Sequence, residues 1–291
     1  MRRSIKSLLK TTGARPKRAL GQNFLTSMAI SQKIVTAAEI RPSDTILEIG
    51  PGLGALTLLL AKKAKRVIAI EKDENLSNTL KDMLKREKIE NVEVLNRDIL
   101  NFQNVLSRPS APNKGTERRR YKLVANLPYN IATAVIMKFL EAETPPELMV
   151  VMVQKEIGQR ICAKPPKMNK LAVFSQLYSQ PKIIGYVAKE YFYPKPKVDG
   201  AILLIKPHPP AAGHQAPRKL FSQIVNAGFS QPRKQLINNL SSGLNLDREA
   251  VVGWLNKNNI KPTQRAESLT ITDWQNLSAT FPVPAPHPNF L

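Results

Sequence analysis

The stretch TILEIGPGLG, residues 45–54, decides the fold. An apolar run rich in β-formers ends in a glycine-rich turn, and a helical pattern follows at 56–64. Glycines let the backbone turn tightly and approach a ligand, and a helix that opens at this turn offers free N–H donors. Glu71 lies 21 residues beyond Gly50, at the end of the next apolar run, where it can hold ribose hydroxyls. The stretch predicts a nucleotide-binding α/β sheet that holds an adenosine-containing cofactor, without separating a dinucleotide from other such cofactors.

Apolar runs and helical patterns alternate from about residue 45 to 206, which is typical of a doubly wound sheet with helices on both faces. The last two apolar runs are joined without a long helix, so we expect them to pair antiparallel at the sheet edge. The predicted strands are 45–50, 66–70, 92–95, 121–125, 147–153, 182–187 and 201–205, and the predicted helices are 56–64, 75–88, 132–140, 156–163 and 171–178.

Two polar, proline-containing breaks predict the domain organisation. The first, 107–120, is expected to be a surface insertion, and the second, 207–217, is followed by helical patterns alone. We therefore expect a small all-helical domain with helices at 219–229, 232–240, 248–258 and 272–280. The predicted parts are a basic flexible arm (1–20), an α/β domain (21–207) that contains the insertion, a helical domain (208–281) and a proline-rich tail (282–291).

Charge and composition narrow the class of protein. Lys and Arg number 44 against 22 Asp and Glu, so the net charge of +22 favours a polyanionic partner such as nucleic acid. No apolar run is long enough to span a membrane. A single cysteine, Cys162, excludes a disulfide framework and a cysteine-cluster metal site, and favours the reducing cytoplasm. The basic N-terminus fits an arm that contacts phosphates, which we favour, or an organellar transit peptide.

Two later segments indicate which chemical groups the site can hold. Asp98 follows the third predicted strand, where its carboxylate can cap a helix or accept a hydrogen bond from an adenine amino group. The segment NLPYN, residues 126–130, follows the fourth, at the edge where such sheets bind ligands. An amide, a carbonyl beside a proline and an aromatic ring can together hold a planar exocyclic amine. No His or Cys lies in these motifs, which agrees with chemistry that needs no strong general base and no metal.

Taken together, these motifs resemble the S-adenosylmethionine-dependent rRNA adenine N6-dimethyltransferases of the KsgA group, which have a Rossmann-like class I methyltransferase sheet. The likeness runs from residue 21 to about residue 280, nearly the whole chain. It rests on residues 21–25 (GQNFL), the glycine loop 48–54, Glu71, Asp98, 126–130, 153–156 (VQKE), 192–199 (FYPKPKVD) and 229–234 (FSQPRK).

The resemblance implies a role for each matching residue. Glu71 would bind the ribose hydroxyls of S-adenosylmethionine, Asp98 its adenine, and Asn126 would lie between cofactor and target base. Tyr129 and Phe192 would sandwich that base by stacking. The implied cofactor-binding set is Asn23, Leu25, Gly50, Gly52, Glu71, Asp98, Ile99 and Asn126, and the implied catalytic set is Asn126, Leu127, Pro128, Tyr129 and Phe192.

The implied reaction is methyl transfer to N6 of two adjacent adenines in the 3′-terminal hairpin loop of small-subunit (16S) rRNA during ribosome biogenesis, giving N6,N6-dimethyladenosine. The partner would be this rRNA within a pre-ribosomal small subunit, and we expect a monomer with no membrane association. Basic residues would hold the RNA, namely Lys195, Lys197, Arg233 and Lys234.

Two relatives of the same fold stay open as alternatives. Macrolide-resistance methyltransferases act on adenine of 23S rRNA and carry a similar Asn-x-Pro-Tyr motif; Gly21 and Leu127 favour the small-subunit enzyme instead. A mitochondrial-type transcription factor of this fold would bind nucleic acid with catalysis secondary, and the complete cofactor set argues against it. A nicotinamide oxidoreductase is disfavoured, because nothing after the fourth predicted strand supplies a hydride-transfer site.

Overall fold

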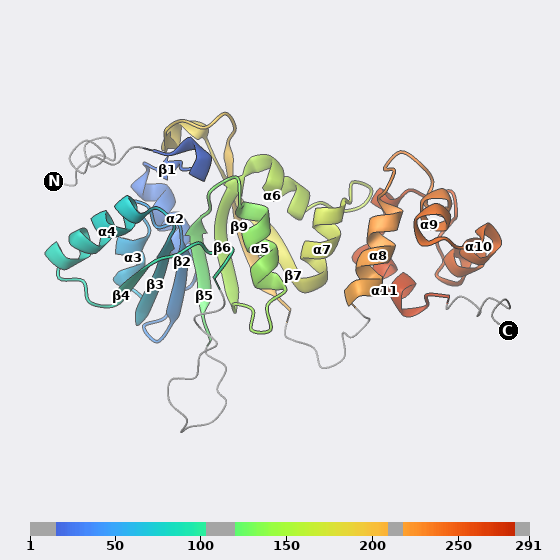
Figure 1. Ribbon diagram of the computed structural model, residues 1–291, viewed down its shortest axis with the longest axis horizontal. Helices are drawn as coiled ribbons and strands as arrows, with labels where there is room; N and C mark the ends of the chain where they lie inside the picture. Colours follow the sequence, from blue (N-terminus) through green and yellow to red (C-terminus); the bar gives the residue numbers. More distant parts are fainter. Residues whose placement is uncertain (1–15, 103–119, 209–217, 283–291) are drawn as a thin grey trace, which may run out of the picture. The chain divides into compact units, whose positions relative to one another are not determined.

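The computed structural model describes residues 16–102, 120–208 and 218–282, which divide into two compact units (Figure 1). The first unit comprises the described residues up to Gln159 together with Tyr178–His208. The second comprises Arg160–Leu177 together with the described residues from 218 onward. Residues 107–119 of the predicted insertion and most of the predicted arm and tail lie outside the described residues.

A seven-stranded sheet with the order β4-β3-β2-β5-β6-β9-β7 forms the centre of the first unit (Figure 1). The strands β2 to β6 run parallel, whereas β9 pairs antiparallel with both β6 and β7. The predicted class, a mostly parallel sheet with antiparallel strands at one edge, is confirmed. The strands are β2 (Thr45–Ile49), β3 (Arg66–Glu71), β4 (Val92–Asn96), β5 (Lys122–Asn126), β6 (Leu148–Gln154), β7 (Ser179–Val187) and β9 (Gly200–Pro207).

Helices cover both faces of this sheet, because alternate residues of each strand point to opposite sides. On one face, α2 (Met28–Ala37) and α3 (Thr57–Ala61) share an apolar core with β2, β3, β5 and β6, and α4 (Glu74–Arg86) packs on β3 and β4. On the other face, α6 (Lys155–Ile161) brings Gly158 against β9, and α5 (Ala132–Leu140) lies on the same side in Figure 1.

The direction of winding reverses between β2 and β5. The chain passes from β2 outward to β3 and β4, then returns to place β5 on the other side of β2. The loops that leave the carboxyl ends of these two strands therefore diverge and open a crevice, which is where doubly wound sheets bind ligands. The glycine loop, Glu71, Asp98 and Asn126 all lie at this edge, directly at or after the ends of their strands.

A two-stranded ribbon lies apart from the main sheet. It pairs β1 (Phe24–Leu25) antiparallel with β8 (Phe192–Tyr193), which follows the 3₁₀ turn η3 (Lys189–Tyr191). A second 3₁₀ turn, η1 (Arg18–Leu20), precedes β1. We call residues 17–25 the strap, since pairing with β8 fastens this N-terminal segment to a part of the chain far away in sequence.

The second unit is helical, with its own apolar core. Met168, Ala172 and Val173 pack in that core with the C-terminal helices, which is why 160–177 joins this unit although the sequence predicted it as part of the α/β domain. Its elements are α7 (Lys170–Tyr178), α8 (Arg218–Gly228), α9 (Leu236–Leu244), α10 (Arg248–Lys257), the 3₁₀ turn η4 (Ala266–Ser268) and α11 (Ile271–Ala279). Within the described residues, no helix has the length and apolar character needed to cross a bilayer.

Candidate active site

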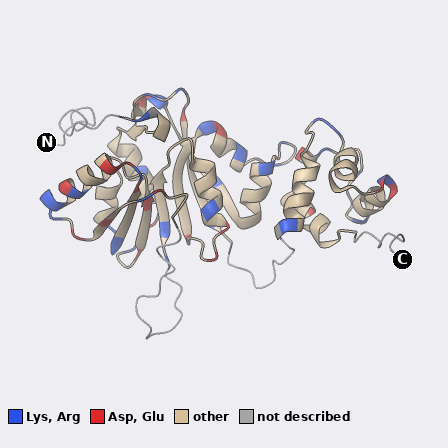
Figure 2. Ribbon diagram, viewed as in Figure 1, with Lys and Arg blue, Asp and Glu red and all other residues tan. Residues whose placement is uncertain are grey.

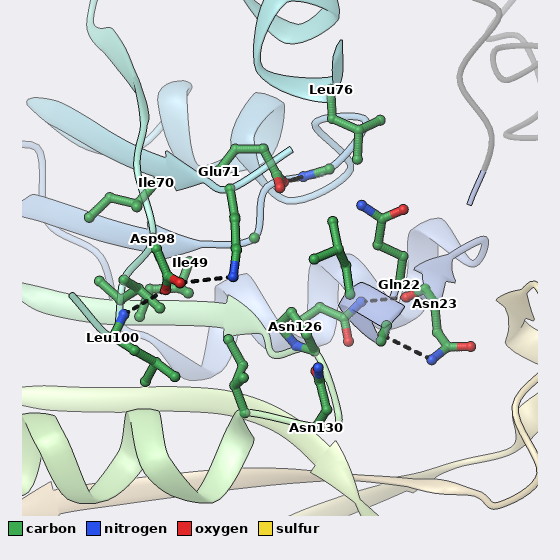
Figure 3. Close-up of a pocket in the computed structure, with 18 of the residues that line it drawn as sticks. Gln22, Asn23, Ile49, Ile70, Glu71, Leu76, Asp98, Leu100, Asn126 and Asn130 are labelled. Atoms are coloured by element: carbon green, nitrogen blue, oxygen red, sulfur yellow. Dashed lines mark hydrogen bonds and ion pairs between the residues drawn. The ribbon is translucent and has the colours of Figure 1, made fainter. Parts of the chain in front are cut away.

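A cavity lies at the carboxyl edge of the sheet, where the winding reverses (Figure 3). In Figure 3, Glu71 and Asp98 stand on one side, Gln22 and Asn23 of the strap on the other, and Asn126 between them. The cavity thus brings together five segments that are far apart in sequence. The predicted cofactor residues that line it are Asn23, Gly50, Gly52, Glu71, Asp98, Ile99 and Asn126.

Glu71 fixes the shape of the glycine loop. Its carboxylate accepts hydrogen bonds from the backbone N–H of Gly52 at 3.1 Å and of Asp73 at 2.9 Å. The expectation of free N–H donors at this turn is therefore wrong at Gly52, because Glu71 takes that donor. The following helix, α3, also starts only at Thr57 and has five residues, so no helix opens directly at the loop.

The backbone of the loop depends on glycine. Gly52 has φ +56°, and a Cβ there would stand 2.9 Å from the ring of Phe24 in the strap. A side chain at this position would both strain the backbone and push the strap away. The loop and the strap therefore approach each other as closely as they do because position 52 lacks a side chain.

Two glutamates are buried near this loop. Burial raises the pKa of Glu48 to about 8, and the neighbouring Glu71 adds to the shift, so Glu48 is largely protonated at neutral pH. Glu48 Oε2 has no hydrogen-bond partner among the described residues. Burial also raises the pKa of Glu71, although the backbone N–H groups of Asp73 and Gly52 favour its charged form. Of the two glutamates, Glu71 is therefore the one whose charged form is stabilised by hydrogen bonds from the glycine loop and from Asp73.

Asp98 lies at the far side of the cavity, after β4. Its carboxylate accepts from Lys72 Nζ at 2.9 Å and from the backbone N–H of Leu100 at 2.9 Å. The bond from Lys72 is the main reason that the pKa of Asp98 is lowered. Asp98 therefore caps a turn, and among the described residues no helix directly follows it; its ionised carboxylate also lines the cavity, and its contact with adenine stays a prediction.

Asn126 has a fixed orientation. Its side-chain Nδ2 donates to the backbone carbonyl of Asn23 in the strap at 3.0 Å. With the nitrogen held, Oδ1 is the amide atom left to accept a hydrogen bond. The next residue, Leu127, is buried, and its N–H donates to the carbonyl of Met152 at 3.1 Å, which fixes the peptide between Asn126 and Leu127.

The two predicted stacking residues meet, but they do not form a parallel clamp. The rings of Tyr129 and Phe192 lie edge to face, with centroids 6.4 Å apart and planes at 62°. A base stacked between two rings needs the ring planes parallel and about 6.8 Å apart, which is two stacking distances of roughly 3.4 Å. The distance between these two rings therefore suits a base, but the angle between their planes does not. Neither ring lines the cavity, and Tyr129 Oη is buried without a partner among the described residues.

Leu25 does not line the cavity, contrary to the sequence-based expectation. Its side chain is buried in the core beside Phe192, its partner across the ribbon. Strand alternation explains this, because Phe24 points toward the glycine loop and the next residue must point away. The sequence assigned no role to Gln22 and Asn130, which do line the cavity; both stood within the motifs 21–25 and 126–130.

Comparison with known proteins identifies the family. A family model described as ribosomal RNA adenine dimethylase matches residues 13–281. The chain belongs to this family. It is 38% identical over 276 residues to ribosomal RNA small subunit methyltransferase A of Dehalococcoides mccartyi, covering 95% of this chain and 92% of that protein. It is 39% identical over 285 residues to the protein of the same name from Latilactobacillus sakei, covering 94% and 92%.

Solved structures of rRNA methyltransferases share the fold of this chain. A dimethyladenosine transferase from Plasmodium falciparum superposes with a TM-score of 0.71 at 25% identity, over 87% of this chain and 95% of that one. The 23S rRNA methyltransferase ErmE superposes with a TM-score of 0.69 at 24% identity, over 88% and 98%. The second likeness shows the fold alone.

Lys and Arg are spread over both units (Figure 2). The four predicted RNA-binding residues are exposed and lie outside the helices and strands. Lys195 and Lys197 follow β8, and Lys195 pairs with Glu190 at 2.7 Å. Arg233 and Lys234 were expected to open a helix, but α9 begins only at Leu236, and they lie in the preceding turn. All four side chains remain accessible to a polyanion.

Proposed function

We propose that this chain transfers methyl groups from S-adenosylmethionine to N6 of two adjacent adenines in the 3′-terminal hairpin loop of small-subunit rRNA during ribosome biogenesis. The observation that carries the proposal is the held amide of Asn126, which stands at the cavity with its oxygen left to accept. Membership of the ribosomal RNA adenine dimethylase family supports the reaction, and relatives named as small-subunit methyltransferases support the choice of subunit.

The residues at the cavity fit S-adenosylmethionine. A carboxylate has about four acceptor sites, and Glu71 uses one on each oxygen, which leaves one on each for two neighbouring ribose hydroxyls. Asp98 likewise has acceptor capacity left beside Lys72 and Leu100 for an amino group on adenine. Gly50 lines the cavity without a side chain, and because its N–H donates to the Ile70 carbonyl at 2.9 Å, its own carbonyl is the backbone group that could accept from the methionine end.

The chain's own residues prepare the nucleophile. The lone pair of an adenine N6 is delocalised into the ring, so this amine is a poor nucleophile. Asn126 Oδ1 and the Leu127 carbonyl would accept its two hydrogens and draw the nitrogen toward a pyramidal geometry. S-adenosylmethionine, when bound, supplies an electrophilic methyl group on a sulfonium. Fixed acceptors favour the positive charge that develops on nitrogen, and correct positioning contributes several kcal/mol.

Tyr129 and Phe192 would grip the flipped-out base, once one ring has turned to bring their planes parallel. The unpartnered hydroxyl of Tyr129 is consistent with a side chain that no hydrogen bond holds in place. Lys195, Lys197, Arg233 and Lys234 would contact the RNA backbone, and we expect the protein to act as a monomer on a pre-ribosomal small subunit.

A labelling experiment tests this function. The purified protein is incubated with methyl-labelled S-adenosylmethionine and, in separate reactions, with small and large ribosomal subunits that lack the modification. We expect label in small-subunit RNA, recovered after nuclease digestion as N6,N6-dimethyladenosine. Label in large-subunit RNA, with none in the small subunit, would overturn the assignment and favour the macrolide-resistance activity.

A further inference from the structure

The strap is fastened at both ends beside the cavity. At its start, Lys17 Nζ lies 2.9 Å from the carboxylate of Asp73, and Gln22 Nε2 donates to the same group at 3.2 Å. Burial alone would raise the pKa of Asp73, but the bonds from Lys17 and Gln22 lower it, so the carboxylate stays ionised. At its end, Phe24 and Leu25 pair with β8.

Between these ends, two side-chain amides, one at the end of β5 and one in the segment after it, donate to strap carbonyls. Asn126 Nδ2 donates to the carbonyl of Asn23 at 3.0 Å, and Asn130 Nδ2 donates to the carbonyl of Ala19 at 3.3 Å. The fit is close at Gly21, which has φ +64°, because a Cβ there would stand 2.5 Å from Asn130 Oδ1. The strap thus touches the catalytic segment at several points along its length.

The Asn23 carbonyl selects which end of the Asn126 amide faces the substrate. If the amide were turned over, its two N–H donors would face an amine that itself donates, and the carbonyl of Asn23 would face an oxygen. Only the observed orientation lets Asn126 accept from N6. A backbone carbonyl of the strap therefore decides whether the side chain can act.

We propose that Asn130 is a positioning residue that, by holding the strap at Ala19, keeps the Asn23 carbonyl in place to orient the amide of Asn126. The strap then has two linked roles: it forms one wall of the cofactor cavity, and it orients Asn126 Oδ1. The inference rests on the proposed methyl transfer for its kinetic consequence alone, since the strap contacts belong to the free protein.

The substitution Asn130→Asp tests this role, because aspartate has nearly the same size and shape as asparagine. It removes the Nδ2 donor and sets a carboxylate oxygen against the Ala19 carbonyl. Asn101→Asp is the matched control, because Asn101 is an exposed asparagine just beyond the cavity residue Leu100 and undergoes the same chemical change. Three measurements are made on each full-length protein: hydrogen exchange of the strap amides, affinity for S-adenosylhomocysteine by calorimetry, and kcat on small subunits at saturating cofactor.

For Asn130→Asp we expect strap amides to exchange about tenfold faster, the Kd for S-adenosylhomocysteine to rise about tenfold, and kcat at saturation to fall by a similar factor. Asn101→Asp should match the wild type in all three. A loss of active protein would lower kcat and leave Kd unchanged, and this pattern would overturn the proposal. A raised Kd with wild-type kcat would also overturn it, because the strap would then hold cofactor without orienting Asn126.

A double-mutant cycle gives a second test if Asn130→Asp folds poorly. Gly21→Ala places a methyl group against Asn130, so truncation by Asn130→Ala should relieve that clash, and the rise in Kd for the double variant should be smaller than the two single effects predict. Independent effects would contradict the contact. Should the wild type fail to methylate small subunits, the proposed function fails, while hydrogen exchange and S-adenosylhomocysteine binding still decide the role of the strap.

Discussion

Replacing Glu71 by glutamine tests whether this one carboxylate both holds the glycine loop and binds the cofactor. Glutamine keeps the shape but turns one acceptor oxygen into a donor, so either the Gly52 or the Asp73 N–H loses its partner. Hydrogen bonds to charged groups contribute about 1.5–3 kcal/mol each, and the release of a buried charge returns part of this. We expect a loss of about 1–2 kcal/mol in the free energy of unfolding, or roughly 2–8 °C in Tm.

The effect on ligand affinity should be larger than the effect on stability. The same change removes an acceptor for the ribose hydroxyls and loosens the glycine loop, so the Kd for S-adenosylhomocysteine should rise about 10- to 100-fold. Calorimetry measures that Kd, and thermal unfolding measures the stability. Glu93→Gln is the control, because Glu93 lies in β4 and pairs with Arg66 at the exposed surface, away from the cavity. An unchanged Kd for Glu71→Gln, with Tm lowered as expected, would refute the reasoning about the ribose.

The remaining predictions concern catalysis, pH and salt. Asn126→Ala should lower kcat by about 10²–10³ while the Kd for S-adenosylhomocysteine rises only a few-fold, because one strap bond is lost; a collapse of affinity would contradict this role. The pKa of Glu48 is about 8 in the folded protein and near 4.5 in the unfolded chain. Between these two pH values the folded state binds one more proton, so the free energy of unfolding falls as the pH rises. Urea unfolding of Glu48→Gln between pH 5 and 9 should show a shallower decline than the wild type, and parallel curves would contradict the assignment. Arg233→Ala and Lys234→Ala should each reduce the slope of log affinity for small-subunit RNA against log salt by about one, and an unchanged slope would remove that residue from the interface.

The sheet could be predicted from the sequence because its central strands, β2, β3, β5 and β6, are buried apolar runs. All seven predicted strands are present, and the helix at 132–140 has the predicted bounds. The helix α2 was missed, although Ser27 caps it and Ile30, Ile34 and Val35 repeat at helical spacing. The β1–β8 ribbon has two residues per strand, too few for any periodicity to show.

Most of the predicted cofactor-binding residues line the cavity, whereas Leu25, Tyr129 and Phe192 do not, and the contacts between the lining residues could not be predicted. Motif spacing placed Glu71 and Asn126 at one edge of the sheet, yet the bond from Gly52 to Glu71 depends on a three-dimensional approach that spacing does not reveal. The same holds for Leu25, which points inward because Phe24, the residue before it in β1, points toward the glycine loop. The ring angle between Tyr129 and Phe192 is set by packing alone.

A crystal structure with a methyl-donor analogue and adenosine would test the central claim most directly. We predict that Asn126 Oδ1 and the Leu127 carbonyl oxygen both lie about 2.7–3.2 Å from N6 of the adenosine, with the Asn23 carbonyl still holding the Asn126 amide. An adenosine bound elsewhere, or either oxygen turned away from N6, would contradict the account.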